Sequence, residues 1–145
     1  MLSFPEPAWF QALGRLMEAE GPLFQRLGYA ETRFVMRVIP DDDGNGGVRD
    51  VGIVIDGYRL IEAAPVTDLE AFDPDFIICA KRSVWNQMLA EIAETGRPSL
   101  RRTMSSLALV GEEMWLESTD QLREDKFYRY NQTLQELLNL SSQLH

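Results

Sequence analysis

Apolar residues alternate with other residues along two stretches near the middle of the chain, and this constrains its fold more than any other feature. The residues that alternate are Phe34, Met36 and Val38 in the first stretch and Val51, Ile53 and Ile55 in the second. A period of two places such residues on one face of a β-strand. We therefore expect a strand over residues 31–39 and a second around 51–55, each with one face in the core.

The dipeptide Asp56-Gly57 follows the second of these strands. Aspartate followed by glycine is typical of a β-hairpin with a type I′ turn, in which both central residues have positive φ. We expect this turn to lead into a third strand over residues 58–63. Residues 41–47 are rich in Asp, Asn and Gly and are expected to form the loop before the second strand.

Segments whose apolar residues have the spacing of a helix come before and after this predicted three-stranded meander. Residues 7–27 have an apolar stripe that predicts a helix, a break at Gly21-Pro22 and a short second helix. Ser83 is expected to cap a helix that ends at Gly96, and residues from Asp120 onward predict a long terminal helix.

The remaining segments of the chain are shorter. Residues 65–75 are expected to form a connecting loop, and the unbroken apolar run 76–80 predicts a strand buried on both faces. A short helix from Ser99 to Met104 and a last strand over residues 106–110 complete the prediction. The order indicates an α+β fold, with a mostly antiparallel five-stranded sheet covered by helices, and one domain over residues 1–145.

Two residue counts exclude several kinds of site. The chain has one cysteine, Cys79, and one histidine, His145 at its end. A disulfide needs two cysteines, a structural zinc site usually needs several Cys or His ligands, and a terminal histidine is poorly placed for a catalytic triad. We expect no metal, no cofactor and no catalytic residue.

The charge of the chain disfavours polyanionic partners. Asp and Glu number 23 against 14 Lys and Arg, which gives a net charge of -9. This opposes binding to nucleic acid and docking on anionic membranes. The sequence contains no signal peptide and no run long enough to insert into a membrane, so we expect a cytoplasmic protein.

Other polar motifs are weaker candidates for a site. The acidic loop 41–46 lacks the glutamate that a calcium loop needs, and a solvated hairpin loop explains it. Adjacent carboxylates such as Glu112-Glu113, or Asp73 and Asp75, could share a proton in a small enzyme. Arg101-Arg102 could bind an anionic head group or lie on a solvated helix face.

Large, soft and aromatic side chains are concentrated between residues 76 and 116. Among them are Trp85, Met88, Leu89, Ile92, Leu100, Met104, Leu107, Leu109, Met114 and Trp115. Methionine adapts to irregular shapes and tryptophan offers a broad apolar surface, so this composition suits a ligand cavity. An ordinary core would have the same composition, and spacing alone leaves both interpretations open.

The order of these segments resembles the sterol carrier protein type 2 family. The resemblance rests on the first helix with Glu18-Ala19-Glu20-Gly21 leading into a strand, and on the meander closed at Asp56-Gly57-Tyr58. It also covers residues 75–138, from the strand at 76–80 to the closing helix. The resemblance implies a twisted five-stranded sheet covered by helices. It also implies an apolar tunnel that takes fatty acyl chains, acyl-CoA or sterols without chemical change.

Carried onto this chain, the resemblance implies a ligand-binding wall from the strand, the two helices and the last predicted strand. Its residues are Phe76, Ile78, Trp85, Met88, Leu89, Ile92, Leu100, Met104, Leu107 and Leu109. The chain departs from the family at Ser105, Ser106 and Glu112-Glu113, which puts a preference for anionic head groups in doubt.

The function that we expect is therefore non-catalytic binding or carriage of a hydrophobic small molecule. The alternatives are a small isomerase or hydrolase that uses Asp or Glu and Tyr in the same cavity, and an accessory subunit that binds a protein. The terminal helix could cap the tunnel or mediate a homodimer.

Overall fold

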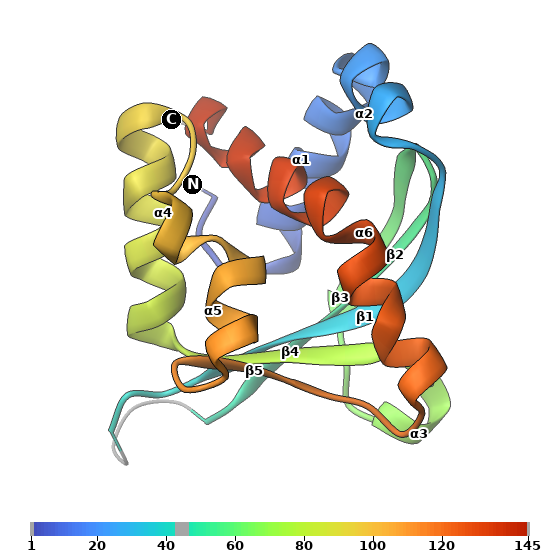
Figure 1. Cartoon of the computed structure of the whole chain (residues 1–145), viewed down its shortest axis with the longest axis vertical. Helices are drawn as coiled ribbons and strands as arrows, with labels where there is room; N and C mark the ends of the chain where they lie inside the picture. The colour runs from blue at the N-terminus through green and yellow to red at the C-terminus, as the bar shows by residue number, and fades with distance from the viewer. Residues whose placement is uncertain (1, 43–46, 145) are drawn as a thin grey trace.

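The computed structural model describes residues 2–42 and 47–144 and contains one five-stranded sheet with helices packed on one face (Figure 1). The strands are β1 (Ala30–Ile39), β2 (Arg49–Gly57), β3 (Arg59–Pro65), β4 (Phe76–Lys81) and β5 (Met114–Glu117). Their order in the sheet is β3-β2-β1-β4-β5. Only β1 and β4 pair in parallel, and the other neighbours are antiparallel. The predicted α+β fold with a mostly antiparallel sheet is confirmed.

Most of the helices lie on one side of this sheet. The larger ones are α1 (Pro7–Ala19), α4 (Arg82–Thr95) and α6 (Gln121–Asn139). The shorter ones are α2 (Gly21–Leu27), α3 (Leu69–Phe72), the 3-10 turn η1 (Leu100–Arg102), α5 (Met104–Val110) and the 3-10 turn η2 (Leu140–Gln143). None of the described helices is long and apolar enough to cross a membrane. Most of the predicted acidic loop, residues 43–46, lies outside the described residues.

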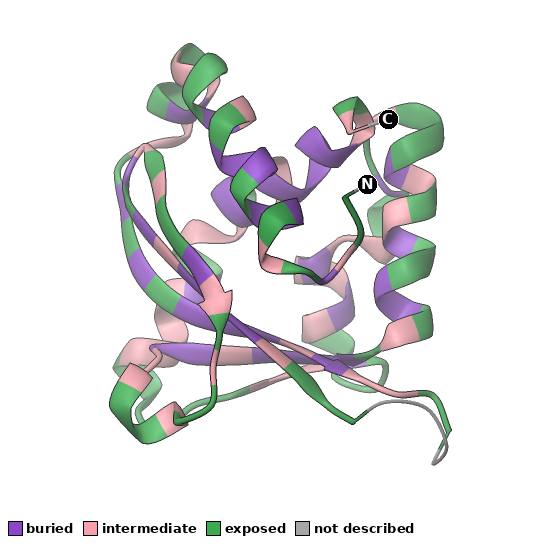
Figure 2. Cartoon of the chain, turned by 180° about the vertical axis from the view of Figure 1, so that it is seen from behind, coloured by how far each residue is buried: buried purple, intermediate pink, exposed green. Residues whose placement is uncertain are grey.

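The alternation that predicted the meander has its expected effect in the structure. Phe34 and Met36 of β1 are buried, as are Ile53 and Ile55 of β2, and Phe34 pairs with Ile53 across the two strands. The residues coloured as buried in Figure 2 lie on the strands and on the helices, and the buried hydrophobic ones form one cluster. The hydrophobic core therefore lies between the inner face of the sheet and the helices.

The hairpin between β2 and β3 forms where it was predicted but with a different turn. Asp56 pairs with Arg59, so Gly57 and Tyr58 are the two loop residues. Gly57 has a φ of 74°, whereas Tyr58 is not among the residues with positive φ. The predicted type I′ turn is wrong, because that turn needs positive φ at both positions.

The predicted strand over residues 106–110 is also wrong, because these residues belong to helix α5. The side chain of Thr103 accepts a hydrogen bond from the backbone N–H of Ser106 and so caps the helix. The last strand, β5, comes after this helix. A short apolar run is compatible with a buried strand or a helix, and here the cap at Thr103 favours the helix.

The opposite face of the sheet is partly covered as well. The predicted connecting loop 65–75 contains α3, whose Phe72 lies over β2. A Cβ atom at Gly52 would be 2.6 Å from Val66 Cγ2 and 2.8 Å from Phe72 Cζ, so only glycine fits beneath these two side chains. This small outer layer explains why Val35, which points away from the helices, is fully buried.

Candidate functional site

Seven of the ten predicted ligand-binding residues come together in the interior between the sheet and the helices. They are Phe76 and Ile78 on β4, Trp85, Met88 and Ile92 on α4, and Met104 and Leu107 on α5, each at most 6% exposed. Leu89 is partly buried and packs against the same cluster. The indole N–H of Trp85 donates to the backbone carbonyl oxygen of Arg37 at 3.2 Å, which fixes α4 against β1.

The other two predicted residues lie on the surface. Leu100 is 86% exposed in η1, and Leu109 is 81% exposed in α5. The alternation of a strand would have put Leu107 and Leu109 on one face, but in a helix residues two positions apart point about 200° away from each other. Leu107 therefore faces the core while Leu109 faces solvent.

The far wall of this interior comes from segments that the prediction of the site did not include. Phe127 of α6 packs edge-on against Phe76 with ring centroids 5.7 Å apart, and Phe34 stacks on Phe76 at 5.3 Å. Phe10 and Leu13 of α1 are fully buried in the same cluster. The helical stripes of α1 and α6 were visible in the sequence, but only tertiary packing directs them toward β4.

The side-chain amide of Gln135 lies where α4, α5 and α6 meet. Oε1 of Gln135 in α6 accepts a hydrogen bond from the backbone N–H of Met104 at 2.8 Å. Its Nε2 lies 3.1 Å from Oδ1 of Asn139 and 3.9 Å from the sulfur of Met88. Gln135 and Asn139 are four residues apart, and each follows a leucine of the apolar stripe, which is the signal in the sequence that marks them.

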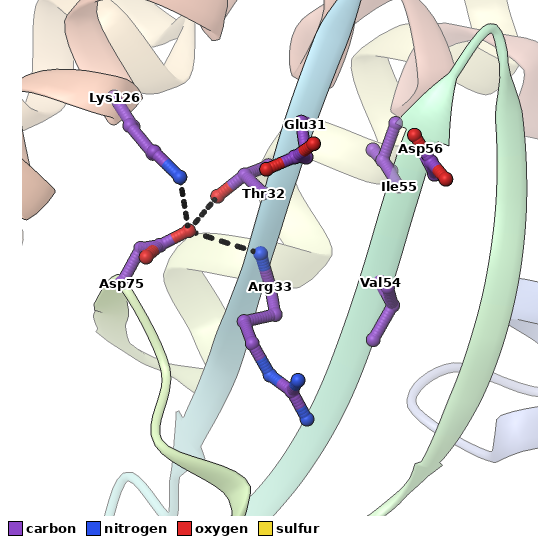
Figure 3. A pocket seen from close by; sticks show the side chains of 8 residues that line it. All are labelled: Glu31, Thr32, Arg33, Val54, Ile55, Asp56, Asp75 and Lys126. Atoms are coloured by element: carbon purple, nitrogen blue, oxygen red, sulfur yellow. Dashed lines mark hydrogen bonds and ion pairs between the residues drawn. The ribbon is translucent and has the colours of Figure 1, made fainter.

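A pocket of about 360 Å³ lies beside the start of β1 and involves Asp75 and Lys126 (Figure 3). Oδ2 of Asp75 accepts hydrogen bonds from Thr32 Oγ1 at 2.9 Å, from the backbone N–H of Arg33 at 3.1 Å and from Lys126 Nζ at 3.2 Å. Arg123 Nε donates to its other oxygen at 3.2 Å. Asp75 is the only charged residue that is buried among those the structure describes.

The surroundings of Asp75 decide its ionisation state. Burial raises the pKa of this carboxyl, but the hydrogen bonds from Thr32, Arg33 and Lys126 outweigh burial and leave the pKa below its usual value. A general acid would need the opposite shift. The predicted pair of Asp73 and Asp75 shares no proton, because Arg123 binds both carboxylates. This arrangement ties α6 to the sheet.

A second pocket, of about 410 Å³, lies on the outer face of the sheet between α3 and the end of β5. Ile77 and Leu69 line it together with Glu117. Glu117 also accepts a hydrogen bond from the thiol of Cys79 at 3.5 Å. Burial, together with the charge of Glu117, raises the pKa of Cys79 to about 12, so the thiol is unreactive at neutral pH.

The two adjacent arginines that the sequence marked as a basic candidate site, Arg101 and Arg102, differ in their exposure and contacts. Arg101 is exposed, while Arg102 is mostly buried between Gln87 of α4 and Glu113, the residue just before β5. Nη1 of Arg102 donates to both carboxylate oxygens of Glu113 at 3.1 and 3.2 Å, and Nη2 donates to Gln87 Oε1 at 2.9 Å. The charge of Arg102 is therefore already neutralised within the chain.

Comparisons with known proteins identify the fold. No protein-family model matches the chain, and no curated protein matches it. A crystal structure of sterol carrier protein 2 is similar, with a TM-score of 0.67 and 21% identity over 97% of this chain and 98% of that one. The solution structure of a conserved hypothetical protein from Thermus thermophilus, possibly a sterol carrier protein, is similar with a TM-score of 0.65 and 20% identity. That match covers 99% of this chain and 90% of the other. The chain thus has a fold like that of sterol carrier protein 2, as the resemblance in its sequence predicted.

Proposed function

We propose that this chain is a non-catalytic cytoplasmic carrier that binds one hydrophobic small molecule between its sheet and its helices. The observation that carries the proposal is the likeness to sterol carrier protein 2 over nearly the whole length of both chains. The ligand would contact the predicted residues that lie in the interior, with Leu100 and Leu109 at its outer edge.

The composition of the interior supports this proposal. In the structure the space is filled by side chains of the chain itself, so a ligand must displace some of them. Met88 and Met104 are suited to this because methionine has three rotatable bonds and a polarisable sulfur. Affinity would come from apolar burial, at about 25 cal/mol for each Å² removed from water.

The state of the buried carboxylate argues against the enzyme alternative. A small isomerase or hydrolase would need a carboxyl with a raised pKa inside an apolar pocket. The pKa of Asp75 is lowered instead, and its oxygens are occupied by Thr32, Arg33, Arg123 and Lys126. We therefore favour binding without chemical change.

The proposal is tested with delipidated full-length protein titrated with the neutral fluorescent probe 1,6-diphenylhexatriene. We expect saturation at one probe per chain and a change in Trp85 emission. Met104→Ala should weaken binding, whereas Leu122→Ala, at a 75% exposed position of α6, should not. If the folded protein binds neither this probe nor any fatty acid, sterol or acyl-CoA, the proposal is wrong.

A surface for a protein partner is the second candidate, and one observation favours it. Leu100, Leu109 and Val110 are 86%, 81% and 69% exposed on η1 and α5. A helix that is apolar on both faces usually has a partner on each. Light scattering coupled to gel filtration would show a dimer if a second copy covers this face, and Leu109→Glu should then give a monomer.

A further inference from the structure

The side-chain amide of Gln135 lies at the boundary between solvent and the apolar interior. Gln135 is partly exposed, whereas Met88 and Met104, which it contacts, are fully buried. Its oxygen is engaged by the backbone N–H of Met104 at the start of α5. Its position suits the polar end of an amphiphile whose tail lies among the methionines.

One hydrogen of this amide has a poor acceptor. Nε2 of Gln135 carries two hydrogens, and Asn139 Oδ1 at 3.1 Å accepts one of them. The other neighbour of Nε2 is the thioether sulfur of Met88, 3.9 Å away. A thioether is a weak acceptor, so an oxygen atom of a ligand could replace it with a net gain. The movement of Met88 that this requires would also open space for the tail.

The charges around this amide disfavour an anionic ligand. No Lys or Arg side chain is fully buried in the part of the chain that the structure describes. Arg102 is the cation nearest in sequence to Met104, and Glu113 already balances its charge by binding Nη1 through both carboxylate oxygens, although the buried Nε has no hydrogen-bond partner among the described residues. A carboxylate that enters the interior would lose its hydration without gaining a cation that is free of a carboxylate partner. The net charge of -9 repels it further.

We propose that Gln135 is the polar contact of the ligand site, and that this site takes a neutral lipid with a hydroxyl or carbonyl oxygen in preference to a fatty acid anion. The inference rests on the proposed carrier function and adds the chemical class of its ligand. The oxygen of the lipid accepts a hydrogen bond from Gln135 Nε2 in place of the Met88 sulfur, and the chain of the lipid enters between α4 and α5.

Three ligands of equal chain length test the proposal, with full-length protein at pH 8. Hexadecanol, hexadecanoate and hexadecane compete with 1,6-diphenylhexatriene, each delivered from cyclodextrin. We expect hexadecanol to bind at least about tenfold more tightly than hexadecanoate, since both ligands have an oxygen that accepts from Gln135, but burying the carboxylate charge costs more than about 1.4 kcal/mol. Hexadecane should lie below hexadecanol, because it has no oxygen to accept from Gln135.

Variants of α6 separate the amide from the general packing. Gln135→Met should reduce hexadecanol binding about tenfold, toward that of hexadecane, and should leave hexadecane binding unchanged. Gln132→Met makes the same substitution at an exposed position of the same helix and should change nothing. Gln135→Glu keeps an oxygen that accepts from the Met104 N–H but lacks the N–H donor of Nε2. It should therefore also weaken hexadecanol binding, and it tests this donor even if Gln135→Met loosens α5.

The outcomes distinguish this inference from the proposed function. If hexadecanoate binds as tightly as hexadecanol, or if both Gln135 variants bind hexadecanol as the wild type does, the inference is wrong while the carrier function stands. If the folded protein binds neither the probe nor any of the three ligands, the carrier function fails and the inference fails with it.

Discussion

Asp75, the residue just before β4, forms two hydrogen bonds with Arg33 of β1. The backbone N–H of Asp75 donates to the carbonyl oxygen of Arg33 at 2.7 Å, and the carboxylate of Asp75 accepts from the backbone N–H of Arg33 at 3.1 Å. The side chain thereby extends the pairing of β1 and β4. Because Lys126 and Arg123 bind the same carboxylate, the start of β4 also holds α6.

Replacing Asp75 by asparagine should destabilise the protein by about 2–3 kcal/mol at pH 7, because donors from β1 and α6 lose a charged acceptor. The pKa of Asp75 is lower in the folded protein than its ordinary value. Its contribution is therefore present above about pH 4, the unfolded pKa, and is lost as the pH falls through the folded pKa.

Urea unfolding at pH 7 and at pH 3 measures this effect. The difference between wild type and Asp75→Asn should shrink at pH 3. Asp73→Asn is the matched control, because Asp73 also binds Arg123 but is largely exposed, and asparagine tolerates its φ of 53°. A loss of stability that is equal for the two variants would contradict the role of Asp75.

Gly52→Ala should destabilise the protein by about 1–3 kcal/mol through overpacking. The added methyl group would collide with Val66 and Phe72 on the outer face of the sheet. Shortening one neighbour should relieve part of the cost, so the double variant Gly52→Ala, Val66→Ala should be more stable than the sum of the single changes predicts. Strict additivity in thermal unfolding would show that the contact imposes no strain.

The thiol of Cys79 should not react with 5,5′-dithiobis(2-nitrobenzoate) in the native protein at pH 8. Burial and the nearby charge of Glu117 raise its pKa to about 12, and the thiolate is the reactive form. One equivalent should react after unfolding in guanidinium chloride. Glu117→Gln removes the charge but leaves the burial, so the native thiol should stay protected; rapid labelling of this variant would show that burial is not the main cause.

Leu107→Ala should cost about 2–4 kcal/mol of stability, whereas Leu109→Ala should stay within about 0.5 kcal/mol. Leu107 is 6% exposed and Leu109 is 81% exposed, because α5 is a helix. Chemical denaturation of the two variants measures the difference. Equal costs would indicate that both side chains face the core, as the strand predicted from the sequence would require.

The sequence was sufficient for the elements whose periodicity is long and clear. The alternation through Phe34 and Met36 identified β1 and its buried face, and Asp56-Gly57 located the hairpin. It failed at residues 106–110, where five mostly small or apolar residues fit a strand as well as a helix. That error reversed the direction of Leu109, whose side chain was expected to face the core and is 81% exposed instead.

The polar residues of the candidate site could not be found in the same way. Gln135 and Asn139 stand beside the apolar stripe of α6, and their spacing alone fits a solvated helix edge equally well. Their relevance comes from Met88 and Met104, which belong to other helices and reach them only through packing. The sequence marked Asp75 only as one of two nearby carboxylates, and its role in holding β1 and α6 follows from its contacts with Thr32, Arg33 and Lys126.

The sequence by itself determined the class of fold, the inner face of the meander and the shortage of groups for metal or histidine chemistry, because these follow from local periodicity and composition. Only the tertiary structure decided that β4 lies parallel to β1, that α5 turns Leu107 inward, and that Gln135 meets Met88. The parallel pairing of β4 and the meeting of Gln135 with Met88 depend on contacts between segments far apart in the chain. The direction of Leu107 depends on a balance between a local strand and a local helix. The spacing of neighbouring residues encodes neither the distant contacts nor that balance.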